Sequence, residues 1–253
     1  MEVCVISSGS KGNCTLVKTK KHNILIDIGN SCKYVCDTLA SLSILPQDID
    51  MVLVTHAHVD HVAGLRVFCK KYHPKVYITD KILKEANIVL DNISDIDKDV
   101  FLDDIVIKVI KTSHDVDDSN GYIIEEDNDS CVYITDTGYI NEKYFKTLSN
   151  KSIYVFESNH DPELLMNNPR YPHHTKIRIL SDRGHLSNND SAYYLSHFIG
   201  PNTKQIILAH LSEENNNEEL AIKTLKEALK SRDIKFDNII CARQNIKTEL
   251  FKV

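Results

Sequence analysis

The sequence lacks the features that mark membrane, secreted and multidomain proteins. Its 253 residues contain no apolar run near the ~18 residues that a membrane-spanning helix needs. Residues 1–6 have no basic region followed by a long apolar core, so they are not expected to form a signal peptide. They predict a strand instead. No segment is rich in proline, glycine or serine, which argues against a flexible linker. We therefore expect one domain over residues 1–253, no membrane contact and a cytoplasmic location.

A regular cysteine framework and a net positive charge are also missing. The seven cysteines form no regular framework, so free thiols in a reducing compartment are expected. The formal net charge of −6 disfavours broad nonspecific attraction to nucleic acid. A nucleic-acid enzyme stays possible, because bound divalent metals and a local basic segment supply a positive field. One such segment exists, although most clusters of this kind are only a solvated face. Its members are Arg170, His173, His174, Lys176, Arg178 and Arg183.

The most informative stretch is a cluster of potential metal ligands behind an apolar run. His56, His58, Asp60 and His61 fall within six positions, directly after residues 51–54, which predict a buried strand. Side chains two positions apart in an extended segment point the same way, so His56 and His58 can hold one metal together. Asp60 and His61 follow as the chain turns into a helix, and they can face a second metal. Imidazole and carboxylate ligands suit zinc and other first-row divalent ions. A polar loop whose histidines only form hydrogen bonds is the weaker alternative.

Four later predicted strands each deliver a further polar candidate at their ends. These are His114, Asp136, His160 and His210. The carboxyl ends of strands are where α/β sheets present functional groups. Each half of the chain also contains strands followed by helices. This order predicts a mixed α+β and α/β fold, a four-layer αβ/βα sandwich with two sheets packed face to face and helices outside.

The remaining pattern predicts the elements between these sites. Strands are expected at 3–6, 14–19, 23–28, 51–54, 75–79, 105–112, 121–125, 131–135, 152–156, 205–209 and 238–242, and helices at 32–42, 62–72, 81–89, 189–198 and 217–231. Residues 91–104 contain six aspartates and no EF-hand pattern, so they predict a solvated acidic loop. Residues 7–13, with two glycines, predict a hairpin loop, although their amides can also hold an anion.

The His-x-His-x-Asp-His pattern resembles the signature of the metallo-β-lactamase-fold hydrolases, over nearly the whole chain. The resemblance implies one metal held by His56, His58 and His114, a second held by Asp60, His61 and His210, and Asp136 as the bridge. It also implies that Asp27, at the end of a predicted strand, supports the metal loop from behind and orients its imidazoles. Taken alone, Asp27 and Asp136 are also typical turn-forming residues before glycine turns.

Two zinc or manganese ions in such a site imply hydrolysis of phosphodiester bonds. A pair of metals roughly 3.5–4 Å apart can hold a hydroxide as nucleophile and clamp the entering and leaving oxygens. Asp60 is expected to help orient that hydroxide. Residues 184–187, Gly-His-Leu-Ser, resemble a run in the tRNA 3′-processing nucleases whose histidine assists the leaving group, so His185 is the candidate proton donor. The alternative is that His185 starts a helix and contacts Asp190 or the backbone.

Three further runs resemble one branch of these hydrolases. Residues 7–13, 157–161 and 209–216 look like the YycJ/WalJ proteins, whose members are described as 5′-to-3′ exonucleases on double-stranded DNA. The resemblance predicts DNA as the substrate. The role of His160 stays open between a phosphate contact, a residue that supports the ligands and a core histidine.

Other functions remain as alternatives. They are another phosphodiesterase acting in tRNA 3′ processing or on a cyclic nucleotide, a lactone, thioester or β-lactam hydrolase, and a metal-bearing regulator. No counterpart of the long tRNA-gripping arm is evident, and no export signal suits a secreted β-lactamase. His58 is intact, whereas di-iron relatives carry glutamate in the metal loop. The oligomeric state and the metal are left open.

Overall fold

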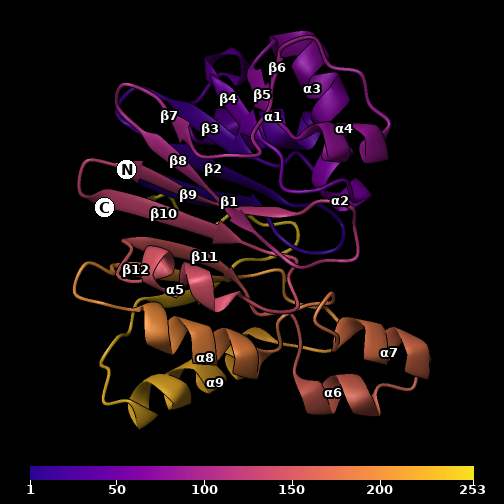
Figure 1. Ribbon diagram of the computed structural model, residues 1–253, viewed down its shortest axis with the longest axis vertical. Coiled ribbons are helices and arrows are strands. Elements are labelled where there is room, and N and C mark those ends of the chain that lie inside the picture. The colour runs from indigo at the N-terminus through magenta and orange to yellow at the C-terminus, as the bar shows by residue number, and fades with distance from the viewer.

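The computed structural model describes residues 1–253 and contains two seven-stranded sheets packed face to face (Figure 1). The strands of the first sheet follow the order β14-β1-β2-β3-β4-β5-β6, and those of the second follow β13-β12-β11-β10-β9-β8-β7. In each sheet, neighbouring strands are antiparallel toward one edge and parallel toward the other. The two halves of the chain therefore repeat one topology.

The strands of the first sheet are β1 (Glu2–Ser7), β2 (Cys14–Lys18), β3 (Asn23–Ile26), β4 (Met51–Leu53), β5 (Lys75–Tyr77), β6 (Ile93–Ser94) and β14 (Phe251–Lys252). Those of the second are β7 (Val100–Phe101), β8 (Val106–Lys111), β9 (Asn120–Glu126), β10 (Asp129–Ile134), β11 (Ile153–Glu157), β12 (Gln205–Ala209) and β13 (Ile239–Cys241).

Helices cover the outer face of each sheet. The first half contributes α1 (Cys32–Ser41), α2 (Val59–Val62), α3 (Leu65–Tyr72) and α4 (Asp80–Ala86), and the second α5 (Phe145–Leu148), α6 (Pro162–Asn167), α7 (His173–Ile179), α8 (Asn188–Phe198) and α9 (Glu218–Ser231). Buried side chains of α1, α3 and α4 pack on the first sheet, and those of α5, α8 and α9 pack on the second. The predicted four-layer sandwich is confirmed.

The layering follows from the alternation of side chains along each strand. In β1, Val3 and Val5 face the core between the sheets, whereas Cys4 and Ile6 pack under the helices. In β11, Val155 faces the same central core, which draws its residues from both sheets. Because both faces of each sheet are covered, these strands are continuous apolar runs, the pattern by which they were predicted.

Several expected elements differ in the structure. The predicted helix 62–72 is divided into α2 and α3 at Gly64, where a Cβ would lie 2.1 Å from the carbonyl oxygen of Asn30. The chain bends there because only glycine fits against that backbone. The predicted acidic loop 91–104 contains the short edge strands β6 and β7, whose pairing supplies order that composition does not indicate.

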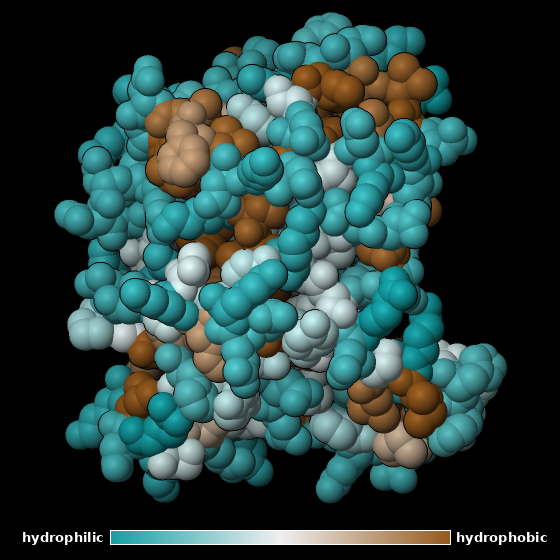
Figure 2. All heavy atoms as spheres, viewed as in Figure 1, coloured by the Kyte–Doolittle hydropathy of each residue, from teal (hydrophilic) through white to brown (hydrophobic).

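The short helices α6 and α7 were not predicted and stand out from the body of the molecule (Figure 1). Figure 2 shows apolar side chains gathered over this arm on a mostly hydrophilic face. The exposed hydrophobic residues there include Leu164, Met166 and Ile177. Helices of six and seven residues are too short for a clear amphipathic period.

None of the helices combines the length and apolar character that crossing a bilayer requires.

Candidate metal centre

The loop that follows β4 carries four of the predicted ligands. His56 and His58 precede α2, and Asp60 and His61 lie in its first turn. His56 and His61 are fully buried, whereas the side chain of His58 is 40% exposed. Gly29 lets this loop pack closely, because a Cβ there would lie 1.6 Å from the carbonyl oxygen of Asp60.

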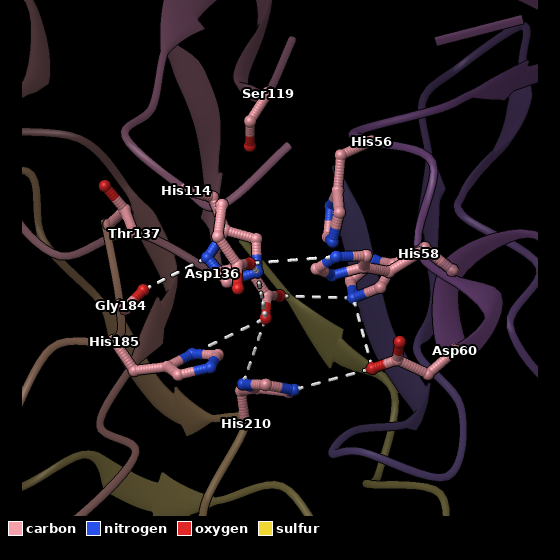
Figure 3. A network of polar contacts seen from close by, with 12 residues as sticks. His56, His58, Asp60, His114, Ser119, Asp136, Thr137, Gly184, His185 and His210 are labelled. Atoms are coloured by element: carbon pink, nitrogen blue, oxygen red, sulfur yellow. Dashed lines mark hydrogen bonds and ion pairs between the residues drawn. The ribbon is translucent and has the colours of Figure 1, made fainter. Parts of the chain in front are cut away.

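The second sheet presents three more predicted ligands to this loop. His114 follows β8, Asp136 follows β10 and His210 follows β12. Figure 3 shows these side chains pointing toward those of the loop, with Asp136 between the two sides. Asp136 and His210 have left-handed backbones, with φ of 56° each. Such values are uncommon outside glycine, and they turn the chain sharply at the strand ends.

The structure brings all seven predicted ligands together. The ligand atoms of His56, His58 and His114 form one group in which all lie within 4.8 Å, and those of Asp60, His61 and His210 form another. Asp136 lies next to both groups. Its carboxylate oxygens are 3.1 Å from Nε2 of His61, 3.4 Å from Nδ1 of His210 and 3.9 Å from Nε2 of His114.

These residues fit divalent metal ions. Nε2 of His56, Nε2 of His210 and Oδ2 of Asp136 are buried without a hydrogen-bond partner. Orphaned buried polar atoms are rare, and each of these three belongs to a candidate ligand. Imidazole nitrogens with carboxylate oxygens form a donor set that such ions prefer.

Burial and neighbouring charges set the protonation of the cluster. Burial and the adjacent His61 hold the pKa of His56 well below its usual range, which leaves the neutral form that binds metal. Burial would also lower the pKa of His210, but Asp136, Asp60 and Glu157 outweigh it and raise this pKa to about 10. Metal binding at His210 therefore has to displace a proton.

Asp27 lies directly behind the metal loop. Its Oδ2 is 2.7 Å from Nδ1 of His61 and accepts a hydrogen bond from the Thr55 hydroxyl, while its Oδ1 accepts one from the Thr55 amide. Burial raises the pKa of Asp27, although His61 and Thr55 favour its charged form. The contact fixes His61 with Nε2 toward the candidate site.

Glu157 plays the corresponding part in the second half, and sequence reasoning gave it no role. Its Oε1 is 2.7 Å from Nδ1 of His185 and 3.1 Å from Nδ1 of His210, while its Oε2 accepts hydrogen bonds from the amides of Thr137 and Leu186. Burial opposes its ionisation, but His185 and His210 lower the pKa of Glu157 to about 2. Its position at the end of an apolar strand was the available signal.

His185 lies at the edge of the same cluster. Its ring centroid is 5.0 Å from that of His114 and 5.2 Å from that of His210, and its side chain is 18% exposed. Nδ1 donates to Glu157, which leaves Nε2 for another partner. Asp190 instead forms a capping box with Ser187, so the alternative contact between His185 and Asp190 is absent. Geometrically, His185 also groups with Asp136, Glu157 and His210 as a possible ligand.

His160 lies outside this arrangement. It is 1% exposed, belongs to no ligand group and has no hydrogen-bond partner on either ring nitrogen. Burial lowers the pKa of His160 to about 4. Its backbone carbonyl accepts from the amide of Asn188, which ties the end of β11 to the start of α8. A direct phosphate contact does not suit a side chain with so little exposure.

The loop formed by residues 7–13 closes over the metal loop as the connection between β1 and β2. Nδ2 of Asn13 lies 2.9 Å from Nε2 of His61 and 3.3 Å from Oδ2 of Asp60, and the Ser8 hydroxyl accepts from the amide of His210. The predicted hairpin loop is therefore also part of the site. Neither Ser8 nor Asn13 was identified individually from the sequence.

Comparison with known proteins identifies the family of this chain. The family described as the Metallo-beta-lactamase superfamily matches residues 8–210. "Exodeoxyribonuclease WalJ" of Streptococcus pneumoniae serotype 2 (strain D39) is 36% identical, covering 91% of this chain and 88% of that protein. "Exodeoxyribonuclease YycJ" of Bacillus anthracis is 36% identical, covering 90% of this chain and 89% of that protein.

Solved structures share the fold. The structure of Zn²⁺-bound PqqB from Methylobacterium extorquens aligns with a TM-score of 0.74 at 14% identity, covering 98% of this chain and 100% of that one. The match extends across both sheets, since nearly every residue of each chain is included. With the family match and the relatives above, the chain belongs to the metallo-beta-lactamase superfamily of metal-dependent hydrolases.

Proposed function

We propose that this protein is a dinuclear-metal phosphodiesterase that degrades DNA from the 5′ end. The observation that carries the proposal is the pair of histidine-containing groups that face each other across Asp136. The substrate follows from the 36% identity, over about nine-tenths of each chain, to proteins named exodeoxyribonucleases. Residues 1–253 act as one unit in this proposal, because residues of both sheets build the central core.

We assign the metal-holding residues as the sequence predicts. His56, His58 and His114 hold one ion, Asp60, His61 and His210 hold the other, and Asp136 joins them. Divalent ions held there supply Lewis acidity and a water nucleophile at neutral pH. Zinc fits the donors by affinity, and manganese fits when it is the available ion. The seven unpaired cysteines support a cytoplasmic location, where thiols stay reduced.

The surrounding residues orient the reaction and move its proton. Asp60 lies at the pocket with 22% of its side chain exposed, so its carboxylate can orient the attacking water. His185 donates a proton from Nε2 to the leaving oxygen. Glu157 accepts a hydrogen bond from Nδ1 of His185 and holds the ring in place. Glu157 also holds His210, which couples proton donation to the geometry of the candidate ligands.

The test is degradation of duplex DNA by purified protein with zinc or manganese, using His58→Ala as the control. A 5′ label should be released at once as a short product, whereas a 3′ label should report progressive shortening, and both signals should vanish in the variant. Cleavage of RNA or of bis-p-nitrophenyl phosphate without cleavage of DNA would instead support another phosphodiesterase. Turnover only of lactones or thioesters would refute phosphodiester chemistry, and no turnover with metal bound would favour a regulator.

A further inference from the structure

The pocket over the candidate metal centre has only one permanent cation. It measures about 170 Å³, and Ile179 is the only hydrophobic residue among the eleven that line it. Its carboxylates are those of Asp60, Asp115 and Asp136, and Arg178 is the only lysine or arginine. A DNA strand carries a negative charge at every nucleotide, so it needs positive partners beyond the scissile phosphate.

The structure separates Arg178 from the other cations of the basic segment. Lys176 is buried and donates from Nζ to the Met166 carbonyl. Arg183 donates from Nε and Nη2 to backbone carbonyls of the segment that carries His114. Arg170 pairs with Glu214 and does not line the pocket. The segment therefore forms no continuous cationic face. Arg178, on α7, is its only arginine or lysine that lines the pocket.

A carboxylate holds the guanidinium of Arg178 at the mouth of the pocket. Nη1 of Arg178 donates to Oδ2 of Asp115 over 2.8 Å. Oδ1 of Asp115 is 3.3 Å from Nε2 of His114 and 3.7 Å from Nε2 of His58, so the ion pair abuts the candidate metal ligands.

The rest of the Arg178 guanidinium is available to a ligand. Only Nη1 has a hydrogen-bond partner, and 63% of the side chain is exposed. A planar guanidinium presents several donors in a fixed fork that matches two oxygens of a phosphate. With Asp115 occupying one donor, the others can bind an anion with little loss of side-chain freedom, because the ion pair already restrains the group.

We propose that Arg178 binds the DNA phosphate next to the scissile bond, and that Asp115 positions its guanidinium for this contact. The inference rests on the proposed function and adds a specificity determinant to it. A chain with several phosphates gains the Arg178 contact, whereas a diester with a single phosphate does not. Arg178 therefore favours nucleic-acid strands over small phosphodiesters.

The test compares Arg178→Ala with Arg178→Lys on duplex DNA and on bis-p-nitrophenyl phosphate, which has one phosphate. Loss of a charge-assisted hydrogen bond should lower kcat/KM for DNA about 10- to 100-fold in Arg178→Ala, mostly through KM. The ratio of DNA to small-diester kcat/KM should fall by about tenfold or more. The slope of log kcat/KM against log salt should flatten by roughly 0.9, the value for one phosphate contact. Lysine should restore the slope but only part of kcat/KM, because it lacks the fork.

Arg170→Ala is the matched control, because Arg170 is an exposed arginine paired with a carboxylate near the same arm. It should match the wild type in DNA kcat/KM and in salt slope. Arg178→Ala with wild-type values on DNA would overturn the Arg178 assignment and leave the proposed function intact. Equal losses on both substrates with reduced metal content would overturn it too, because Arg178 would then act through Asp115 on the metal centre. Wild-type protein that cleaves the small diester but not DNA would refute the proposed function, and this inference with it.

Discussion

The first sheet supplies its candidate ligands from one loop, whereas the second supplies them from three separate strand ends. His56, His58, Asp60 and His61 are neighbours in the sequence, and local geometry alone brings them together. His114, Asp136 and His210 are far apart in the sequence and meet only because β8, β10 and β12, which precede them, belong to one sheet, with a single strand between β8 and β10 and between β10 and β12. The sequence of the first half therefore identifies the site as a metal site. The second half completes the set of candidate ligands through the order of its strands.

Each half also supports its imidazoles with a buried carboxylate, but the two carboxylates differ in what they hold. Asp27 contacts one imidazole, that of His61, and is otherwise bonded to Thr55. Glu157 contacts two imidazoles, that of the candidate ligand His210 and that of the candidate proton donor His185. We therefore expect Asp27 to influence metal binding alone, and Glu157 to influence both metal binding and proton transfer.

Removing a ligand from the loop should have the largest effect. His58→Ala should lower turnover on the order of 10³-fold or more, since a residue that organises transition-state stabilisation is lost together with metal. Metal analysis of the purified variant and DNA hydrolysis measure both losses. His174→Ala, which removes an exposed imidazole outside the pocket, is the control and should match the wild type. Full metal content and full turnover in His58→Ala would show that the loop does not contribute to the metal site.

His185→Ala should come next, with an effect on chemistry and none on metal content. Loss of a general acid should slow DNA cleavage about 10²-fold. The p-nitrophenolate leaving group of bis-p-nitrophenyl phosphate needs little protonation, so hydrolysis of this compound should be far less affected. A fall in bound metal would assign His185 to the ligand group with Asp136 and His210, contrary to our assignment.

Asp27→Asn and Glu157→Gln test the difference between the two carboxylates directly. Each variant should weaken metal binding about 10- to 100-fold, the usual effect of losing a partner that orients a ligand. At saturating metal, Asp27→Asn should recover its kcat on DNA, whereas Glu157→Gln should stay slow because a neutral amide oxygen is a weaker acceptor for Nδ1 of His185 than a carboxylate. Titration with metal during a DNA cleavage assay separates the two effects. Equal recovery by both variants would contradict the comparison.

The smallest effect concerns stability and not catalysis. Burial lowers the pKa of His160 to about 4 in the folded protein, below the ordinary value of 6.5. The folded state therefore resists protonation, and stability is lost as the pH falls from the ordinary pKa toward the folded pKa. Between about pH 7.5 and about pH 5 this costs about 2 kcal/mol.

His160→Asn lacks the titrating ring and should escape this loss. Urea unfolding gives the free energy of unfolding of both metal-free proteins at the two pH values. Relative to the wild type, the variant should become more stable by about 2 kcal/mol between the higher and the lower pH. The other histidines titrate in both proteins, so their contributions cancel. A difference that does not change with pH would show that His160 titrates normally in the folded chain.

The amino-acid sequence by itself determined the layers of the fold and the identity of the candidate ligands. Apolar runs predict strands because side-chain direction alternates with the backbone, and the metal loop is recognisable because its spacing is local. Asp27 was expected behind the loop through family resemblance, and the structure places it 2.7 Å from His61. Asp136 and His210 were recognisable as strand-end residues, although nothing local indicates that their strands, β10 and β12, lie on either side of β11 in one sheet.

The tertiary structure alone decided that Glu157 supports the site and that Arg178 lines its pocket. Glu157 is one carboxylate among many in the sequence, and its contacts with His185 and His210 depend on loops that return to the same sheet edge. Arg178 and Arg183 look alike in the basic segment, yet one lines the pocket while the other bonds backbone carbonyls. Contacts of this kind join residues distant in the chain, so they follow from strand pairing and packing, which local periodicity does not encode.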